Sequence, residues 1–217
     1  MRLRRLVPVL LVLGLLPLAT VQAQFDKEYK SWYPHVAVGY SVPLAEFDDL
    51  AQDGFSINGG VTYKPSDWAV GVIMDLAYSD YNLERSFLDA ADSSGGDSDV
   101  WSLTAGGIWA PTSGGKVGFY LSAMIGVTRL KAQLTEPTSG CYWCCDPWWP
   151  WYCYCCTGGD IVTGSRATTE LSGSLAAGLT FKVSDMGSTI FLECKYNYVN
   201  TEHNAAQYVP ISVGYRW

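Results

Sequence analysis

Bulky apolar residues alternate with small or polar residues along most of this chain. For example, Val70, Val72 and Met74 alternate with Ala69 and Gly71. A period of two puts alternate side chains on opposite faces of a strand, whereas a helix would group residues three and four apart. The pattern therefore predicts strands. Eight segments show it, at residues 33–44, 55–63, 68–79, 100–109, 117–128, 171–183, 190–198 and 208–217.

The predicted connections alternate between short and long. The short ones, 64–67, 112–115 and 184–187, are built from residues that accept turn geometry. The long polar ones are residues 45–54, 80–99, 134–164 and 200–207. An even strand number with short periplasmic turns and long outer loops is typical of outer-membrane barrels. We therefore expect an all-β fold for residues 24–217, a closed antiparallel eight-stranded transmembrane β-barrel of up-and-down topology.

The face opposite the bulky residues consists mostly of Gly, Ala, Ser and Thr, and charge is concentrated in turns and loops. A soluble sandwich or lipocalin-like barrel would need charged residues on its solvent face. A narrow interior filled by small side chains and an uncharged outer wall fit a lipid environment instead. Aromatic residues near both strand ends predict two interfacial girdles. One contains Tyr63, Trp68, Trp109, Phe119, Phe181, Tyr215 and Trp217, and the other contains Tyr78, Trp101, Tyr198 and Tyr208.

The N-terminus is typical of a secretory signal peptide over residues 1–23. Arg2, Arg4 and Arg5 precede a short apolar run, and small residues lead up to Gln24. A short membrane anchor is the alternative. Removing this leader leaves 11 basic residues against 21 acidic ones, a net charge near −10. Such a field would repel DNA or RNA, so we expect no nucleic-acid partner.

The last ten residues read Y-V-P-I-S-V-G-Y-R-W and end in Tyr215 and Trp217. With the alternation and the predicted topology, they make the chain resemble the OmpA/OmpX-like family of eight-stranded outer-membrane β-barrels. The resemblance covers residues 33–217. It implies an outer-membrane location in a diderm bacterium, contact with outer-membrane lipid, and a C-terminal signal read by the barrel-assembly machinery. Such signals more often end in Phe, so Trp217 is a variant.

Four charged residues share the inward parity of the predicted strands: Asp75, Glu193, Lys195 and Arg216. Buried charges are tolerated when they are paired and hydrogen-bonded. We therefore expect an interior ion-pair cluster with Glu193 at its acidic centre and Arg216 or Lys195 as its partner, in a filled cylinder. A proton or ion path is the alternative interpretation, because perturbed charges also mark functional sites.

The loop 133–164 is unusually rich in Cys and Trp, and we expect it to be extracellular. Its cysteines are Cys141, Cys144, Cys145, Cys153, Cys155 and Cys156. An even cluster in an exported protein favours disulfides, with 15 possible connectivities for three bridges. Metal binding by some of these thiolates is the alternative, although no His accompanies them. Our prediction is disulfides, with no metal and no cofactor.

Trp148, Trp149 and Trp151 lie in the same loop beside two prolines. Exposed apolar patches usually mark contact with a partner or a membrane. These residues therefore predict contact with an unknown extracellular partner, although a local core for the loop would use them equally well. In loop 80–99, residues 82–92 suit either a short amphipathic helix or an unstructured segment.

The remaining reactive side chains point to no enzyme. Cys194 has the lipid-facing parity and is expected to act as a small apolar residue. The two histidines are His35 and His203, and neither has a recognisable nucleophile beside it. We expect no catalytic residues, and a structural or adhesive role through the outer loops. The alternatives are a small-molecule conduit and a lipid-modifying outer-membrane enzyme.

Overall fold

The computed structural model describes residues 31–65, 68–91, 93–111, 116–137, 142–145, 153–156, 160–184, 188–201 and 205–217. For residues 137, 142–145, 153–156, 160 and 161 only the backbone is described. The barrel lies within one compact unit, Ser31–Trp217.

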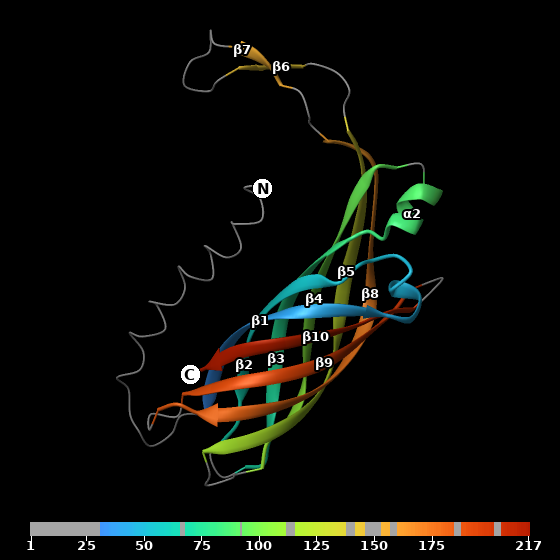
Figure 1. Ribbon diagram of the computed structural model, residues 1–217. Helices are drawn as coiled ribbons and strands as arrows, with labels where there is room; N and C mark the ends of the chain where they lie inside the picture. The colour runs from blue at the N-terminus through green and yellow to red at the C-terminus, as the bar shows by residue number, and fades with distance from the viewer. Residues whose placement is uncertain are drawn as a thin grey trace. The chain divides into compact units, whose positions relative to one another are not determined.

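Eight of the described strands close into one antiparallel barrel with up-and-down order, as predicted (Figure 1). They are β1 (Trp32–Leu44), β2 (Gly54–Tyr63), β3 (Val70–Asn82), β4 (Gly95–Trp109), β5 (Val117–Pro137), β8 (Asp160–Lys182), β9 (Thr189–Asn200) and β10 (Ala205–Arg216). The strands β6 (Tyr142–Cys145) and β7 (Cys153–Cys156) form a separate two-stranded sheet. No helix among the described residues is long and apolar enough to cross a bilayer.

The barrel closes between its first and last strands. The β1–β10 ladder runs from the pair His35–Arg216 to the pair Leu44–Gln207. The backbone N–H of Trp217 donates to the carbonyl of Pro34 at 3.1 Å. Both ends of the described barrel chain therefore lie at one end, which also holds the three short connections and is called the turn end below. The opposite end is called the loop end.

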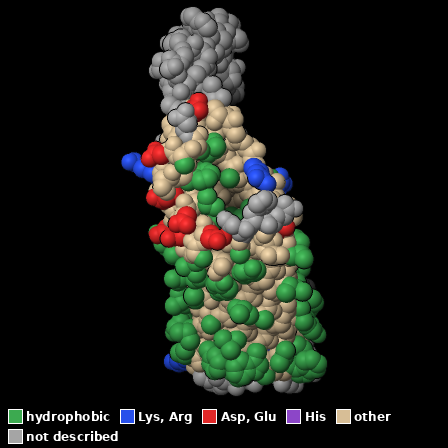
Figure 2. All heavy atoms as spheres, turned by 90° about the vertical axis from the view of Figure 1, so that its right-hand side faces the viewer, with side chains coloured by type: hydrophobic (Ala, Val, Ile, Leu, Met, Phe, Trp, Pro, Cys, Tyr) green, Lys and Arg blue, Asp and Glu red, His purple; other side chains and the backbone are tan. Residues whose placement is uncertain are grey.

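The two faces of the wall are as the alternation predicts. Val72 is 59% exposed, whereas Ile73 beside it is buried. Figure 2 shows hydrophobic side chains covering much of the visible wall, and acidic and basic side chains gathered mainly towards the loop end. The bulky side chains that point outward include Val70, Met74, Leu103, Leu121, Ile125, Leu171, Leu175, Leu192, Ile211 and Val213.

Most strands extend further at the loop end than the sequence predicted, and β4, β5 and β8 do so by the most. The β5–β8 ladder reaches the pair Pro137–Asp160, with one register irregularity at Leu134/Thr135. The predicted bounds of the long loop, 134–164, are therefore wrong, and so is the start of β4, which lies at Gly95. Hydrogen bonds between neighbouring strands continue past the point where the side chains stop alternating, so alternation underestimates strand length.

Two short helical turns lie in the connections at the loop end. Within the predicted segment 82–92, the structure forms the helix α2 (Arg85–Ala90). The 3₁₀ turn η3 (Ala45–Phe47) follows β1 directly. Ala45 starts this turn with a φ of 53°, a left-handed conformation that costs a non-glycine residue free energy.

Tyr208 does not belong to the interfacial girdle, and that prediction is wrong. Its parity along β10 is that of the buried Ser212, so its ring points inward and is 3% exposed. The Tyr208 ring lies 6.2 Å from that of Phe47 and 6.1 Å from that of Tyr81. We call the buried group to which these rings belong the outer aromatic cluster; it consists of Phe47, Ala51, Tyr81, Val100, Val199, Ala206 and Tyr208.

Candidate functional site

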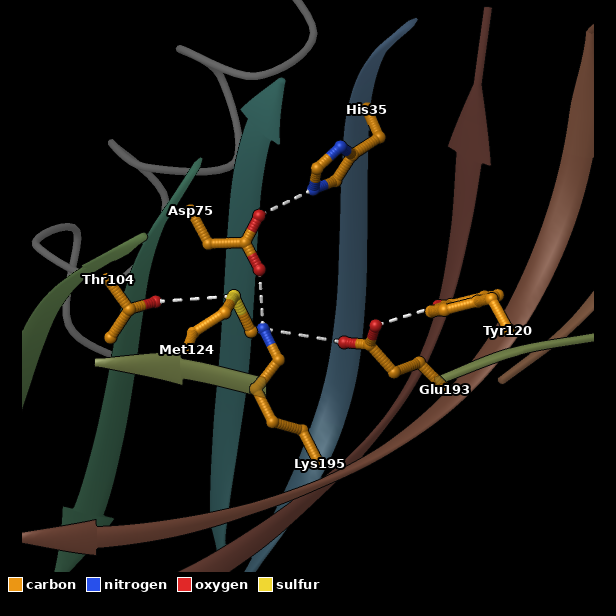
Figure 3. A network of polar contacts seen from close by, with 7 residues as sticks. All are labelled: His35, Asp75, Thr104, Tyr120, Met124, Glu193 and Lys195. Carbon is orange, nitrogen blue, oxygen red and sulfur yellow. Dashed lines mark hydrogen bonds and ion pairs between the residues drawn. The ribbon is translucent and has the colours of Figure 1, made fainter. Parts of the chain in front are cut away.

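The most distinctive polar site lies inside the barrel and centres on Asp75 of β3 (Figure 3). Lys195 Nζ of β9 donates to Asp75 Oδ2 at 2.6 Å. His35 Nε2 of β1 lies 2.8 Å from Asp75 Oδ1. An ionised carboxylate only accepts hydrogen bonds, so Nε2 is the protonated nitrogen of this imidazole.

The contacts continue from Lys195 through Glu193 of the same strand to β5, on the far side of β8. Lys195 Nζ also lies 3.4 Å from Glu193 Oε1. The Tyr120 hydroxyl of β5 donates to Glu193 Oε2 at 2.7 Å. We call this chain of contacts the interior network; it joins His35, Asp75, Lys195, Glu193 and Tyr120.

A glycine on the intervening strand allows His35 to reach Asp75. Gly60 of β2 pairs with His35 on one side and with Asp75 on the other. A Cβ atom on Gly60 would overlap Asp75 Oδ1 and would lie 2.9 Å from His35 Cε1. The side chains of two strands that are not neighbours therefore meet over the bare backbone between them.

The same arrangement recurs on the other side of the barrel. Gly178 of β8 pairs with Tyr120 and with Glu193. A Cβ atom on Gly178 would overlap the Tyr120 ring and would lie 2.6 Å from its hydroxyl oxygen. The small residues of the inward face therefore make room for rings and long side chains, besides filling a narrow interior.

Of the two partners expected for Glu193, Lys195 makes a described ion pair with it, and Arg216 lies over two aromatic rings. Its Cζ atom lies 5.0 Å from the ring centroid of Tyr120 and 5.2 Å from that of Phe191. A guanidinium over an aromatic face is attracted by the ring quadrupole. Lys195 joins the two carboxylates of the network, those of Asp75 and Glu193.

Burial makes the interior network rigid and sensitive to the loss of one member. The side chains of Asp75, Glu193 and Lys195 are 2%, 3% and 6% exposed. Removing one partner of a buried pair typically costs about 3–5 kcal/mol, because the other charge stays buried without compensation. The arrangement therefore suits cross-bracing of the barrel wall.

Sequence reasoning missed two members of the network, His35 and Tyr120. The parity of His35 was read correctly as inward, but the residue was considered only as a catalytic candidate. A usable signal was present: His35, Gly60 and Asp75 have the same inward parity on three consecutive strands. Recognising it required the exact register, which alternation alone does not supply.

Other residues singled out in the sequence lie elsewhere or outside the described residues. Cys194 of β9 is a free, exposed cysteine on the outer wall, in agreement with its parity. Tyr215 and Trp217 stack at the turn end with centroids 5.8 Å apart. The predicted disulfide cysteines and the three loop tryptophans have side chains outside the described part of the chain, as does His203.

Comparison with known proteins gives likeness in structure alone. No family model and no curated protein matches the chain. The crystal structure of Neisserial surface protein A matches with a TM-score of 0.54 at 14% identity, covering 88% of this chain and 98% of that one. Ail, the attachment invasion locus protein of Yersinia pestis, matches with a TM-score of 0.50 at 18% identity, covering 85% and 98%.

A second structure of Ail, in complex with the heparin analogue sucrose octasulfate, matches with a TM-score of 0.50 at 17% identity, covering 86% and 99%. At such low identities, this structural likeness shows a common fold alone. The closed barrel, its apolar outer wall and these neighbours together indicate an outer-membrane location. The chain therefore has the fold of the OmpA/OmpX-like family of eight-stranded outer-membrane β-barrels.

Proposed function

We propose that this protein is a surface-interaction barrel, which displays a binding surface for an extracellular partner at its loop end. The observation that carries the proposal is the extension of β5 and β8 (Figure 1). The β8–β9 ladder ends outward at the pair Ser172–Val199, whereas the β5–β8 ladder continues to Pro137–Asp160. The ladder continues far beyond the end of β9, and β4 accompanies β5 as far as the pair Gly95–Thr135, so these three strands give the Cys/Trp-rich loop a stiff support.

The filled interior favours a structural role over a conduit. The interior network spans the barrel from β1 to β5, and the outer aromatic cluster lies nearer the loop end. An eight-stranded barrel has an interior just wide enough for side chains to fill. Single-channel recording in a planar bilayer tests this choice, because a steady conductance would make the conduit the better proposal.

Export and assembly form part of the same proposal. Residues 1–23 would be removed as a signal peptide, and Tyr215 and Trp217 would be recognised by the barrel-assembly machinery. The six loop cysteines would form disulfides in the oxidising space outside the inner membrane. Mass spectrometry of the non-reduced protein would show the new N-terminus and the bridges, and free thiols with bound metal would favour the metal alternative.

The charge of the chain limits the kind of partner. One solved Ail structure contains a heparin analogue, which is a polyanion. This chain has 21 acidic residues against 14 basic ones, and Figure 2 shows both acidic and basic side chains towards its loop end, so the excess charge is negative. Like charges across an interface are repulsive, so the partner is expected to be neutral or basic, with an apolar patch for Trp148, Trp149 and Trp151.

An adhesion assay tests this function. Cells displaying the protein should adhere to a cationic or neutral surface more than cells with an empty vector, and no better to a heparin-coated one. Replacing Trp148, Trp149 and Trp151 by Ala should abolish the difference while the barrel keeps its heat-modifiable mobility on a gel. The matched control is Ser174→Ala inside the wall. Adhesion equal to the vector on every surface would contradict the proposal.

A lipid-modifying enzyme is the other function to exclude. His35 is held by Asp75 inside the barrel, with a side chain that is 2% exposed, so it does not face lipid. His203 is the other histidine of the chain. Release of fatty acid from outer-membrane lipid, abolished by His203→Ala, would replace the surface-interaction proposal by an enzymatic one.

A further inference from the structure

A cavity of about 220 Å³ lies at the loop end, between the extended strands and the loop-end connections. Its walls come from η3, α2, β4, β5, β8, the start of β10 and single residues of the adjoining connections, among them Thr201. They are largely apolar. The lining side chains include Phe47, Leu50, Leu83, Phe87, Leu130 and Arg166.

The outer aromatic cluster supports one side of this cavity. Phe47 lines the cavity and is itself 6% exposed, with its ring 5.3 Å from that of Tyr81. Leu130 also lines the cavity and packs against the same cluster. The left-handed Ala45 begins the turn that inserts Phe47, and strain of this kind often marks a functional site. Because Phe47 and Leu130 both pack against the outer aromatic cluster, this wall of the cavity is well packed.

The opposite side carries a positive charge. Arg166 and Thr168 line the cavity from the part of β8 beyond Ser172, where the ladder with β9 has ended. The ion pairs between described residues belong to the interior network, so no described carboxylate pairs with the Arg166 guanidinium. Glu46, on η3, is the acidic residue among the lining residues.

We infer that this cavity binds an amphiphile with one alkyl chain and an anionic head group. The chain would lie among Phe47, Leu83 and Leu130, and the head would meet Arg166, whose planar fork matches a carboxylate or phosphate. Apolar cavities of about 150 Å³ already bind benzene, so the present volume suits a longer chain segment. The site does not use the Cys/Trp-rich loop, so it is independent of the proposed function.

NMR spectroscopy of the folded barrel in nanodiscs of deuterated phosphatidylcholine tests the site with dodecanoate. The methyl groups of Leu83 and Leu130 should show saturable shifts and contacts with the ligand's terminal methyl. Leu175, 61% exposed on the lipid-facing wall, reports simple partitioning into the bilayer. Shifts at Leu83 and Leu130 that do not saturate, or that only parallel those of Leu175, would overturn the inference.

Two variants separate head-group recognition from chain burial. Arg166→Gln should weaken dodecanoate binding about tenfold and leave dodecanol binding within about twofold, because a charge-assisted hydrogen bond is lost. Arg129→Gln removes an exposed positive charge of outward parity on β5 and should change neither. Equal effects of the two Arg variants would overturn the role of Arg166.

Filling the cavity tests the place of the alkyl chain. Ala132 lines the cavity, and Ala132→Trp should abolish the saturable shifts with both dodecanoate and dodecanol. Heat-modifiability on a gel checks that this variant folds. If it does not fold, the comparison of Arg166→Gln with Arg129→Gln tests the inference instead. Unchanged binding to a folded Ala132→Trp barrel would overturn the inference.

The same anionic chemistry comes from a free fatty acid or from a membrane lipid. Repeating the dodecanoate titration in nanodiscs containing lysophosphatidylglycerol, a phosphatidylglycerol with one acyl chain, distinguishes the sources. Competition by lysophosphatidylglycerol would identify a membrane lipid as the ligand, and an unchanged dissociation constant would identify the free fatty acid. Either result supports the site, whereas no saturable binding in both lipid compositions contradicts it.

Discussion

Both halves of the barrel interior contain an apolar cluster, but the buried charges of the described ion pairs lie in one half only. Nearer the turn end, the interior network joins His35, Asp75, Lys195, Glu193 and Tyr120 by hydrogen bonds and ion pairs. Nearer the loop end, the outer aromatic cluster fills the same cylinder with rings and aliphatic side chains.

The two halves are also held in different ways. Every member of the interior network lies on a barrel strand, so the strand register and the closure of the barrel bring these residues together. The outer aromatic cluster depends on Phe47, which a connection inserts through the turn η3. Removing one charge from the interior network should therefore lower the free energy of unfolding by a large amount. A single change at the loop end should change it only slightly.

The largest effect should follow from Lys195→Met. This change leaves Asp75 and Glu193 buried without their shared cation, at a cost of about 3–5 kcal/mol. The free energy of unfolding in urea, measured by tryptophan fluorescence in lipid vesicles, should fall by that amount. Lys182→Met, an exposed lysine at the end of β8, should cost less than about 0.5 kcal/mol. Equal losses for both variants would remove the distinction between the two halves.

One substitution on each face of the barrel wall tests which face is in contact with lipid. Val72→Arg should place charge in the hydrocarbon at a cost of about 2–4 kcal/mol near the midplane. Ser174→Ala on the inward face should be mild, because the Ser174 hydroxyl makes no hydrogen bond to the described residues. The same unfolding measurement compares them, and equal tolerance would reverse the assignment of faces.

Gly178 pairs with Tyr120 on one side and with Glu193 on the other, and its substitution tests whether their contact requires a residue without a side chain between them. Gly178→Ala should cost about 1–3 kcal/mol, because the added methyl group overlaps a buried ring that has no room to move. Gly107→Ala is the matched control, since a Cβ atom there meets nothing within 4 Å. If the two variants unfold at the same urea concentration, the Tyr120–Glu193 contact does not depend on the bare backbone.

The smallest effect concerns the loop-end half. Ala45→Gly should raise the unfolding free energy slightly, by about 0.5 kcal/mol, because glycine adopts a positive φ without strain but loses more chain entropy on folding. The midpoint of urea unfolding measures this change. Destabilisation by more than about 1 kcal/mol would show that Ala45 contributes through its methyl group rather than through backbone strain.

Much of the fold followed from local pattern. Alternation placed Val72 and Val213 on the outer wall and Ser174 on the inner one, and short and long connections indicated which strands are neighbours. The same parity rule marked Asp75, Glu193 and Lys195 as inward. These inferences succeed because side-chain direction in a strand depends only on position along the chain.

The alternation along the sequence could not predict contacts between residues on different strands. Tyr208 was assigned to the girdle from its place near a strand end, although its own parity pointed inward. The loop-end extension of β5 and β8 was missed because backbone hydrogen bonding carries the ladder on without side-chain alternation.

By itself, the sequence determined the number of strands, their order and the face on which each side chain lies, because a period of two and the length of a connection are local properties. The tertiary structure alone decided that His35 meets Asp75 over Gly60, that Lys195 joins the carboxylates of Asp75 and Glu193, and that Phe47 packs on Tyr81. Those contacts depend on register and barrel closure, which bring residues distant in sequence to the same level of the cylinder.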